Sequence, residues 1–207
     1  MADDSDDTHS HERGNETHGH GEGDDHDHHH HDLDELGFGV VTVSSSRRID
    51  DGDTSGDAII ELIEGAGHGV VVRELVTDDY DSLQNTVDRL ANRGDTDCVV
   101  TTGGTGVTPD DVTIEAIEPL LDKRLPGFGE LFRSLSRGEI GTKVVGTRAT
   151  AGVVDGVPVF CLPGSENAVR LGTREIIVAE APHLAGLAKR DETESDDEDT
   201  ETETDGE

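Results

Sequence analysis

A glycine-rich turn at residues 101–106 has the clearest capacity in this sequence to bind an anion. Three of its last four residues are glycines, so backbone amides can approach a ligand closely, and Thr102 and Thr105 add hydroxyl donors. The turn follows an apolar run that predicts a strand, and α/β sheets bind ligands at the carboxyl ends of parallel strands. The same residues could also form only a tight turn, because they match neither a P-loop nor a dinucleotide fingerprint.

Carboxylates occur near this turn and on the neighbouring strand. Asp111 could cap a helix that is expected to begin near residue 111 or 112, or it could hold a divalent cation against phosphates on the glycine loop. Asp78 and Asp79 follow the second expected strand and reach the same edge of the sheet. Solvated loop carboxylates are the alternative in so acidic a chain.

A second strand, turn and helix start occur at residues 162–165. Ser165 could bind an anionic group together with the amides that follow it, or it could simply cap the helix. Three arginines are candidates to neutralise ligand phosphates, with surface ion pairing as the alternative for each: Arg133, Arg137 and Arg148.

The elements that must position these residues alternate along the chain. Apolar runs predict strands at residues 37–43, 70–76 and 97–102, and helical periodicity predicts helices capped by Thr54 or Ser55, over 80–92, and from 111 or 112. A looser second half predicts a helix over 129–137, a hairpin of 147–154 and 157–162, and a last helix from Ser165 to about 181. Strand–helix alternation with short links predicts a mostly parallel sheet covered by helices on both faces.

Charge divides the chain into three parts. Of the net charge of −32, residues 1–36 carry −12, residues 37–189 carry −10 and residues 190–207 carry −10. The two ends are nearly free of apolar residues, so we expect a disordered acidic histidine-rich arm, one α/β domain at 37–189, and a disordered acidic tail. The acidity suits a salt-rich cytoplasm and predicts a halophilic source.

Several classes of protein are excluded by composition. The sequence has no basic stripe that could contact nucleic acid. It has no apolar run long enough to span a membrane, and its acidic, polar start does not resemble a signal peptide. We therefore expect a cytoplasmic protein. Cys98 and Cys161 sit within apolar runs and are interpreted as buried small residues.

Nine of the 11 histidines lie in the arm, which ends in a cluster of His26, His28, His29, His30 and His31. These imidazoles could bind zinc or nickel weakly and exchangeably. The alternatives are a solvated tract without a partner and a residual purification tag.

Several short motifs follow one another along the predicted domain. They are Asp53-Thr-Ser-Gly56, Gly103-Gly-Thr-Gly106, Asp111-Val-Thr113 with Glu115-Ala116, Pro126-Gly-Phe-Gly-Glu-Leu-Phe-Arg133, Leu135-Ser136, Glu139-Ile-Gly141, Arg148-Ala149 with Ala151-Gly152, and Leu162-Pro-Gly-Ser165. In this order they resemble the MoaB/MogA family of molybdenum cofactor synthesis, over about residues 37–189. The match looks closer to the MoaB branch.

The resemblance implies a three-layer α/β/α domain, usually a homotrimer, that binds molybdopterin beside the glycine loop. Catalysing members use Mg²⁺ and ATP to place AMP on the terminal phosphate of molybdopterin, and a MoeA-like protein then inserts the metal. Asp78 and Asp111 match the family's functional aspartates, so we expect them to position Mg²⁺ and nucleotide. Ligand contacts are expected from Ser44, Thr102, Gly103, Gly104, Thr105, Gly106, Pro163, Gly164 and Ser165.

Two other functions compete with this enzyme. A non-catalytic module of the same fold could bind molybdopterin as a carrier or scaffold, and some MoaB proteins lack a suitable carboxylate pair. A metal-buffering protein acting through the histidine arm is the third alternative. The two retained carboxylate positions favour the enzyme.

Overall fold

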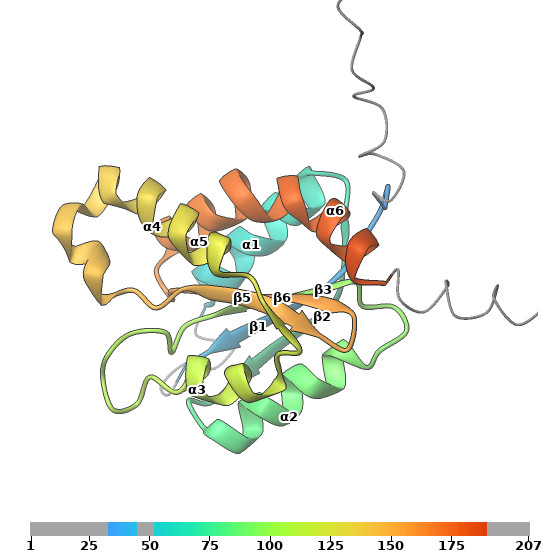
Figure 1. The fold of residues 1–207 in the computed structure, drawn as a ribbon, viewed down its shortest axis with the longest axis horizontal. Coiled ribbons are helices and arrows are strands. Elements are labelled where there is room, and N and C mark those ends of the chain that lie inside the picture. Colours follow the sequence, from blue (N-terminus) through green and yellow to red (C-terminus); the bar gives the residue numbers. More distant parts are fainter. Residues whose placement is uncertain (1–32, 45–51, 190–207) are drawn as a thin grey trace, which may run out of the picture.

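The computed structural model describes residues 33–44 and 52–189. Within them, one six-stranded sheet has the order β2-β1-β3-β6-β5-β4 (Figure 1). Pairings among β2, β1, β3 and β6 are parallel, whereas β5 is antiparallel to both β6 and β4. The strands are β1 (Gly37–Val43), β2 (Gly69–Val76), β3 (Cys98–Thr102), β4 (Lys123–Arg124), β5 (Thr150–Val154) and β6 (Val157–Leu162).

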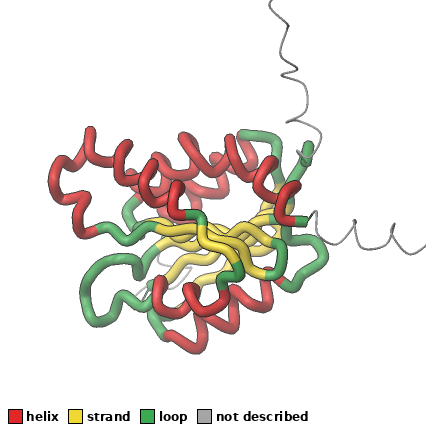
Figure 2. Tube along the Cα trace, viewed as in Figure 1, coloured by secondary structure: helices red, strands yellow, loops and turns green. Residues whose placement is uncertain are grey.

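Helices cover both faces of this sheet and give three layers (Figure 2). One face carries α1 (Thr54–Gly65), α4 (Pro126–Ile140), α5 (Glu166–Gly172) and α6 (Val178–Ala188), and the other carries α2 (Tyr80–Ala91) and α3 (Thr113–Ile117). Both faces of the sheet are apolar and need a covering layer, as strand β1 shows. Phe38 and Val40 belong to the core on one face, and Val41 and Val43 belong to the core on the other face. The predicted three-layer, mostly parallel α/β fold is confirmed.

The structure adds elements that periodicity did not predict. The two-residue strand β4 is too short to show an alternating pattern. Helix α4 begins at Pro126 and ends at Ile140, so it is longer than expected. The last helix continues through a π-helical turn, Thr173–Ile177, into α6.

The packed fold also begins before Gly37, because Leu36 is fully buried and Leu33 packs against the same core. The histidine cluster at residues 26–31 and the tail at 190–207 lie outside the described residues. None of the helices in the described part of the chain combines the length and apolarity needed to cross a bilayer.

Helix α1 is capped by a buried carboxylate, Asp53, and not by Thr54 or Ser55 as expected. Its oxygens accept hydrogen bonds from Thr42 Oγ1 at 2.6 Å, from the Gly56 amide at 2.9 Å and from Arg73 at 3.0 Å. Burial opposes ionisation of Asp53, but these hydrogen bonds and the Arg73 charge outweigh it and hold the pKa of Asp53 below its ordinary value. Asp53 thereby ties α1 to strands β1 and β2.

Replacing Asp53 by asparagine is expected to lower the free energy of unfolding at pH 7 by about 1–3 kcal/mol, because a buried hydrogen-bonded charge is lost. A carboxyl with a depressed folded pKa stabilises above its unfolded pKa and loses that contribution as the pH falls through the folded pKa. Chemical denaturation at pH 7 and below pH 4 should therefore show a smaller acid loss in the variant. Asp57→Asn is the control: this carboxylate also pairs with Arg73 but is 62% exposed, so its loss should cost less than about 1 kcal/mol.

Candidate functional site

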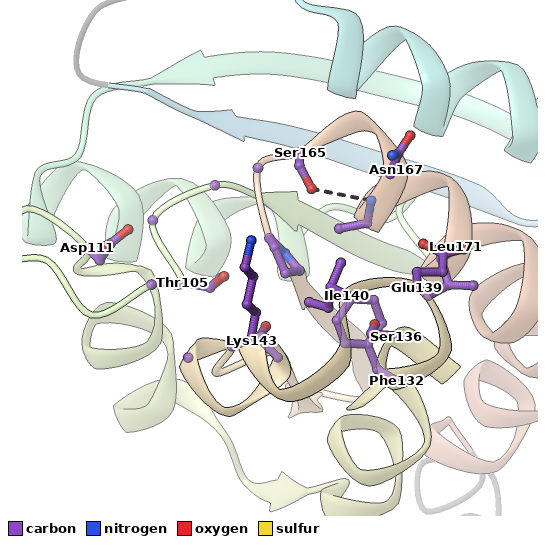
Figure 3. A pocket seen from close by; sticks show the side chains of 18 residues that line it. Thr105, Asp111, Phe132, Ser136, Glu139, Ile140, Lys143, Ser165, Asn167 and Leu171 are labelled. Carbon is purple, nitrogen blue, oxygen red and sulfur yellow. Dashed lines mark hydrogen bonds between the residues drawn. The ribbon is translucent and has the colours of Figure 1, made fainter. Parts of the chain in front are cut away.

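A cavity of about 550 Å³ opens at the carboxyl ends of β3 and β6 (Figure 3). Its polar edge comes from the two predicted turns and Asp111, and its apolar wall comes from α4 and α5. Eight of the predicted ligand residues line it: Gly103, Gly104, Thr105, Gly106, Asp111, Pro163, Gly164 and Ser165. The structure therefore brings together most of the residues that were expected to contact the ligand.

The glycine loop can take its shape only because Gly103 and Gly104 have no side chain. Their φ angles are +101° and +61°, a region that other residues rarely adopt. A Cβ on Gly103 would lie 2.3 Å from the Val43 carbonyl oxygen. Thr113 holds the loop in this conformation through two hydrogen bonds. Its hydroxyl donates to the Gly103 carbonyl at 2.8 Å, and its amide donates to the Gly104 carbonyl at 3.0 Å.

The two turns are joined beneath the cavity. Thr102 is fully buried and its hydroxyl donates to the Pro163 carbonyl at 3.0 Å, so Thr102 connects the turns and does not line the cavity. Ser55, at the start of α1, donates to the Gly164 carbonyl at 2.9 Å. The close approach leaves little room for a side chain at residue 164, where a Cβ would lie 3.1 Å from Gly103 Cα.

Ser165 lines the cavity and is also the N-cap of α5, with its hydroxyl oxygen accepting from the Ala168 amide at 3.4 Å. The capping role expected as one alternative is therefore present. Anion binding by Ser165 stays a prediction.

Asp111 does not cap the helix that follows it, because the N-cap of α3 is Val112 and no side chain bonds there. Its carboxylate instead accepts from the Thr108 amide at 2.8 Å and from the Thr108 hydroxyl at 2.6 Å. Burial opposes its ionisation, but these bonds, the Gly106 amide and the nearby Arg148 charge keep the pKa of Asp111 below its ordinary value. Asp111 is thus an ionised group that closes the loop and faces the cavity.

Asp78 and Ser44 lie near this loop but do not line the cavity. A Cβ on Gly104 would come within 3.1 Å of Asp78 Oδ1, so this carboxylate sits beside the glycine loop. Ser44 directly follows β1, and its amide donates to the Val76 carbonyl at 2.9 Å. Asp78 and Asp111 therefore flank opposite parts of one loop, as their positions after β2 and β3 predict.

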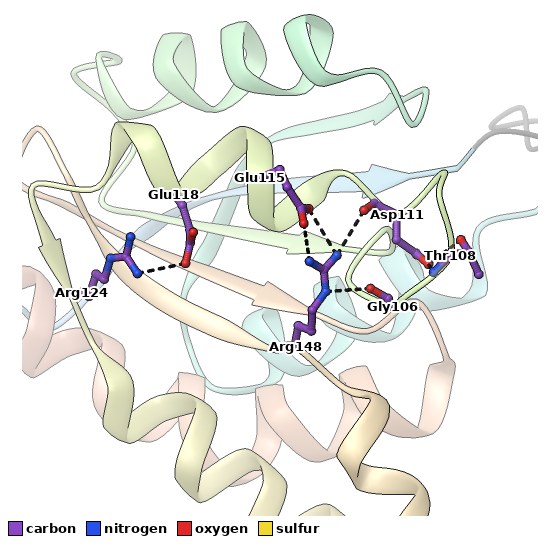
Figure 4. Close-up of polar contacts among 7 residues, drawn as sticks. All are labelled: Gly106, Thr108, Asp111, Glu115, Glu118, Arg124 and Arg148. Atoms are coloured by element: carbon purple, nitrogen blue, oxygen red, sulfur yellow. Dashed lines mark hydrogen bonds and ion pairs between the residues drawn. The ribbon is translucent and has the colours of Figure 1, made fainter.

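Arg148 forms the ion pair that was expected as the alternative to a phosphate contact. Its guanidinium donates to the Gly106 carbonyl at 2.7 Å and to the Asp111 carbonyl at 3.1 Å, and it pairs with Glu115 (Figure 4). It is therefore committed to the backbone of the loop and to α3. Arg133 and Arg137 do not line the cavity either, and Arg133 contacts the Ala149 carbonyl.

Comparison with known proteins identifies the family. A family model described as "Probable molybdopterin binding domain" matches residues 39–183. The chain belongs to this molybdopterin-binding family. Relatives named as molybdenum cofactor biosynthesis protein B and as MoaB confirm the resemblance to MoaB/MogA proteins.

Three relatives of this molybdopterin-binding domain illustrate the match. Molybdenum cofactor biosynthesis protein B of Bacillus subtilis is 45% identical over 73% of this chain and 89% of its own. A molybdopterin adenylyltransferase of Pyrococcus furiosus is 45% identical over 73% of this chain and 90% of its own. The crystal structure of the tungsten cofactor synthesizing protein MoaB from Pyrococcus furiosus has a TM-score of 0.65 and 42% identity, covering 76% of this chain and 99% of that one.

Sequence reasoning did not assign the wall of the cavity in this molybdopterin-binding domain. Helix α4 contributes Phe132, Ser136, Glu139 and Ile140, and the 3₁₀ helix η3 (Gly141–Gly146) contributes Lys143. Residues 132, 136 and 140 are spaced by one helical turn, so they lie on one face of α4. That spacing was a usable signal, but it equally predicts a face packed only against the core.

We expect replacement of Arg148 by methionine to raise KM about tenfold with a smaller change in kcat, because the loop would lose its link to Glu115 and become less ordered. Arg148→Lys should rescue little of this loss, since an ammonium cannot reproduce the forked contacts of a guanidinium. Initial rates at varied substrate concentration would measure both values. Arg124→Met is the control, because Arg124 pairs with Glu118 on the same side of the domain, away from the cavity. Unchanged kinetics in Arg148→Met would rule out this positioning role.

Proposed function

We propose that this chain is a molybdopterin adenylyltransferase that acts in molybdenum or tungsten cofactor synthesis. An oxygen of the terminal phosphate of molybdopterin would form a bond to the α-phosphorus of ATP. The bond from that phosphorus to the oxygen bridging to the β-phosphate would break, and pyrophosphate would leave. The products are adenylyl-molybdopterin and pyrophosphate.

The observation that carries this proposal is the two-sided cavity. The glycine loop, Ser165 and the ionised carboxylate of Asp111 form one edge, and an apolar wall lies opposite, formed by Phe132, Ile140 and Leu171. Phosphates suit the first side, and a flat pterin or purine ring suits the second. Its volume of about 550 Å³ lies within the range of small-molecule sites.

The chemistry requires positioning more than proton transfer. The attacking phosphate is already an anion, so a strong general base is unnecessary, and alignment of the two substrates supplies much of the acceleration. In this assignment, the amides of Gly104 and Thr105 and the Thr105 hydroxyl hold a phosphate, because the Gly103 amide donates to the Leu162 carbonyl at 3.0 Å and the Gly106 amide donates to Asp111. Ser165 lies where a second anionic group would sit.

The carboxylates of Asp111 and Asp78 could supply part of the coordination shell of a magnesium ion. Within the described ranges no group of three or more His, Cys, Asp or Glu side chains could enclose a metal. Mg²⁺ in proteins usually has only one or two carboxylate ligands, and phosphates and water complete its coordination. Asp111 and Asp78 could supply these carboxylates. When bound, the ion would neutralise charge on the transferring phosphates.

The test is molybdopterin-dependent release of pyrophosphate from magnesium-ATP by the purified full chain in a multimolar potassium chloride buffer. Turnover supports the adenylyltransferase. Molybdopterin binding without pyrophosphate release would instead make the protein a carrier, the second candidate. We further propose a homotrimer that passes its product to a MoeA-like metal-insertion protein; sedimentation and a pull-down with such a protein would test these.

A further inference from the structure

The polar edge of the cavity has little positive charge for a site that would hold two phosphorylated substrates. Its ionisable lining residues are Asp111, Glu139 and Lys143. The chain as a whole carries a net charge of −32, so its long-range field repels anions and does not make up for the small number of cationic groups at the cavity. Among the described residues that line the cavity, Lys143 is the one cation.

The lysine is placed for this use by the turn that carries it. Helix α4 ends at Ile140, and its C-cap Gly141, with a φ of +61°, turns the chain into η3. The turn closes with a hydrogen bond from the Thr147 amide to the Val144 carbonyl at 3.1 Å. Figure 3 shows the Lys143 side chain extending from this turn into the cavity, toward the edge formed by the glycine loop and Ser165.

The ammonium of Lys143 also differs from most basic groups of the fold, because it has no partner among the described residues. Arg73, Arg148 and Arg170 each pair with carboxylates, and Lys189 pairs with Asp97. In the parts of the chain that the structure describes, no hydrogen bond or ion pair engages Lys143. In so acidic a chain, a lysine that faces a cavity without a carboxylate partner is available to an external anion.

We propose that Lys143 binds a phosphate group of the substrate opposite the glycine loop. The inference rests on the proposed function for the identity of the substrate, but it needs only that the cavity takes a phosphate. The group could belong to the polyphosphate of the nucleotide or to the phosphate monoester of the pterin. A charged hydrogen bond to phosphate in a partly enclosed site affects affinity by about tenfold or more.

The experiment measures binding of pyrophosphate and of molybdopterin separately, by calorimetry, to the full-length wild-type chain, Lys143→Met, Lys143→Arg and the control Lys123→Met. Lys123 lies in edge strand β4 and does not line the cavity. We expect Lys143→Met to weaken one of the two probes about tenfold or more, Lys143→Arg to restore much of it, and Lys123→Met to bind as wild type. The probe that weakens identifies the phosphate. Both lysines are exposed, so equal melting temperatures should confirm that the variants fold.

Wild-type affinity of Lys143→Met for both probes would overturn the inference. That result is distinguishable from failure of the proposed function, because binding is measured without turnover. A chain that binds pyrophosphate through Lys143 but releases none from ATP would keep the inference and reject the adenylyltransferase. Normal turnover and normal affinities in Lys143→Met would reject the role of Lys143 and keep the adenylyltransferase.

Discussion

Replacing Asp111 by alanine is expected to slow molybdopterin-dependent pyrophosphate release by about a hundredfold or more. The carboxylate lines the cavity, is held ionised by its hydrogen bonds, and closes the loop through Thr108. Its loss removes both a charge beside the phosphates and an anchor of the glycine loop. Steady-state kinetics at saturating magnesium-ATP would measure the effect.

A second variant of Asp111 separates the effect of its charge from the effect of its hydrogen bonds to Thr108. Asp111→Asn keeps an oxygen that can accept from the Thr108 amide and hydroxyl, but it removes the charge. If charge is what matters, this variant should be nearly as slow as Asp111→Ala while retaining the wild-type melting temperature. Asp110→Ala is the matched control, because Asp110 is the neighbouring exposed carboxylate and does not line the cavity. Activity of Asp111→Ala within a few-fold of wild type would remove this residue from the machinery.

Much of the fold could be predicted because the signals are local. The apolar run of β1 predicts burial on both faces, and Phe38 and Val41 indeed belong to the two separate cores. Parallel strands place their carboxyl ends at one edge, and the turns after β3 and β6 meet there because these two strands are neighbours in the sheet. The hydrogen bond from Thr102 to Pro163 is the direct result of that topology.

Other parts of the site depend on contacts between distant residues. Nothing in the local sequence distinguishes an arginine that binds a ligand from one that holds a loop, and Arg148 reaches Gly106 across 42 positions. Ser55 and Gly164 are likewise separated by 109 positions. Lys143 could not be assigned because its direction is set by the reversal at Gly141, which fixes where η3 lies relative to the glycine loop.

The glycine loop provides a second large expected effect, through substitution of Gly103 by alanine. Residue 103 combines a φ of +101° with a Cβ position 2.3 Å from the backbone of β1, so the added methyl must displace the loop or the strand. We expect a loss of about 3 kcal/mol or more in the free energy of unfolding, which corresponds to a fall of roughly 6–12 °C in melting temperature. Binding of both phosphate-bearing substrates should weaken with it.

Gly138→Ala is the matched control for this variant. Gly138 lies within α4, and a Cβ there would meet no atom within 4 Å. The same chemical change should therefore raise the free energy of unfolding by about 0.5–1 kcal/mol, since alanine is the better helix former, and leave pyrophosphate release unchanged. Opposite signs of the two shifts would show that the loop, and not a general intolerance of added methyl groups, sets the cost. Equal melting temperatures and equal affinities for Gly103→Ala and wild type would mean that the backbone of this loop can relax without losing the site, and that its glycines are not required for phosphate binding.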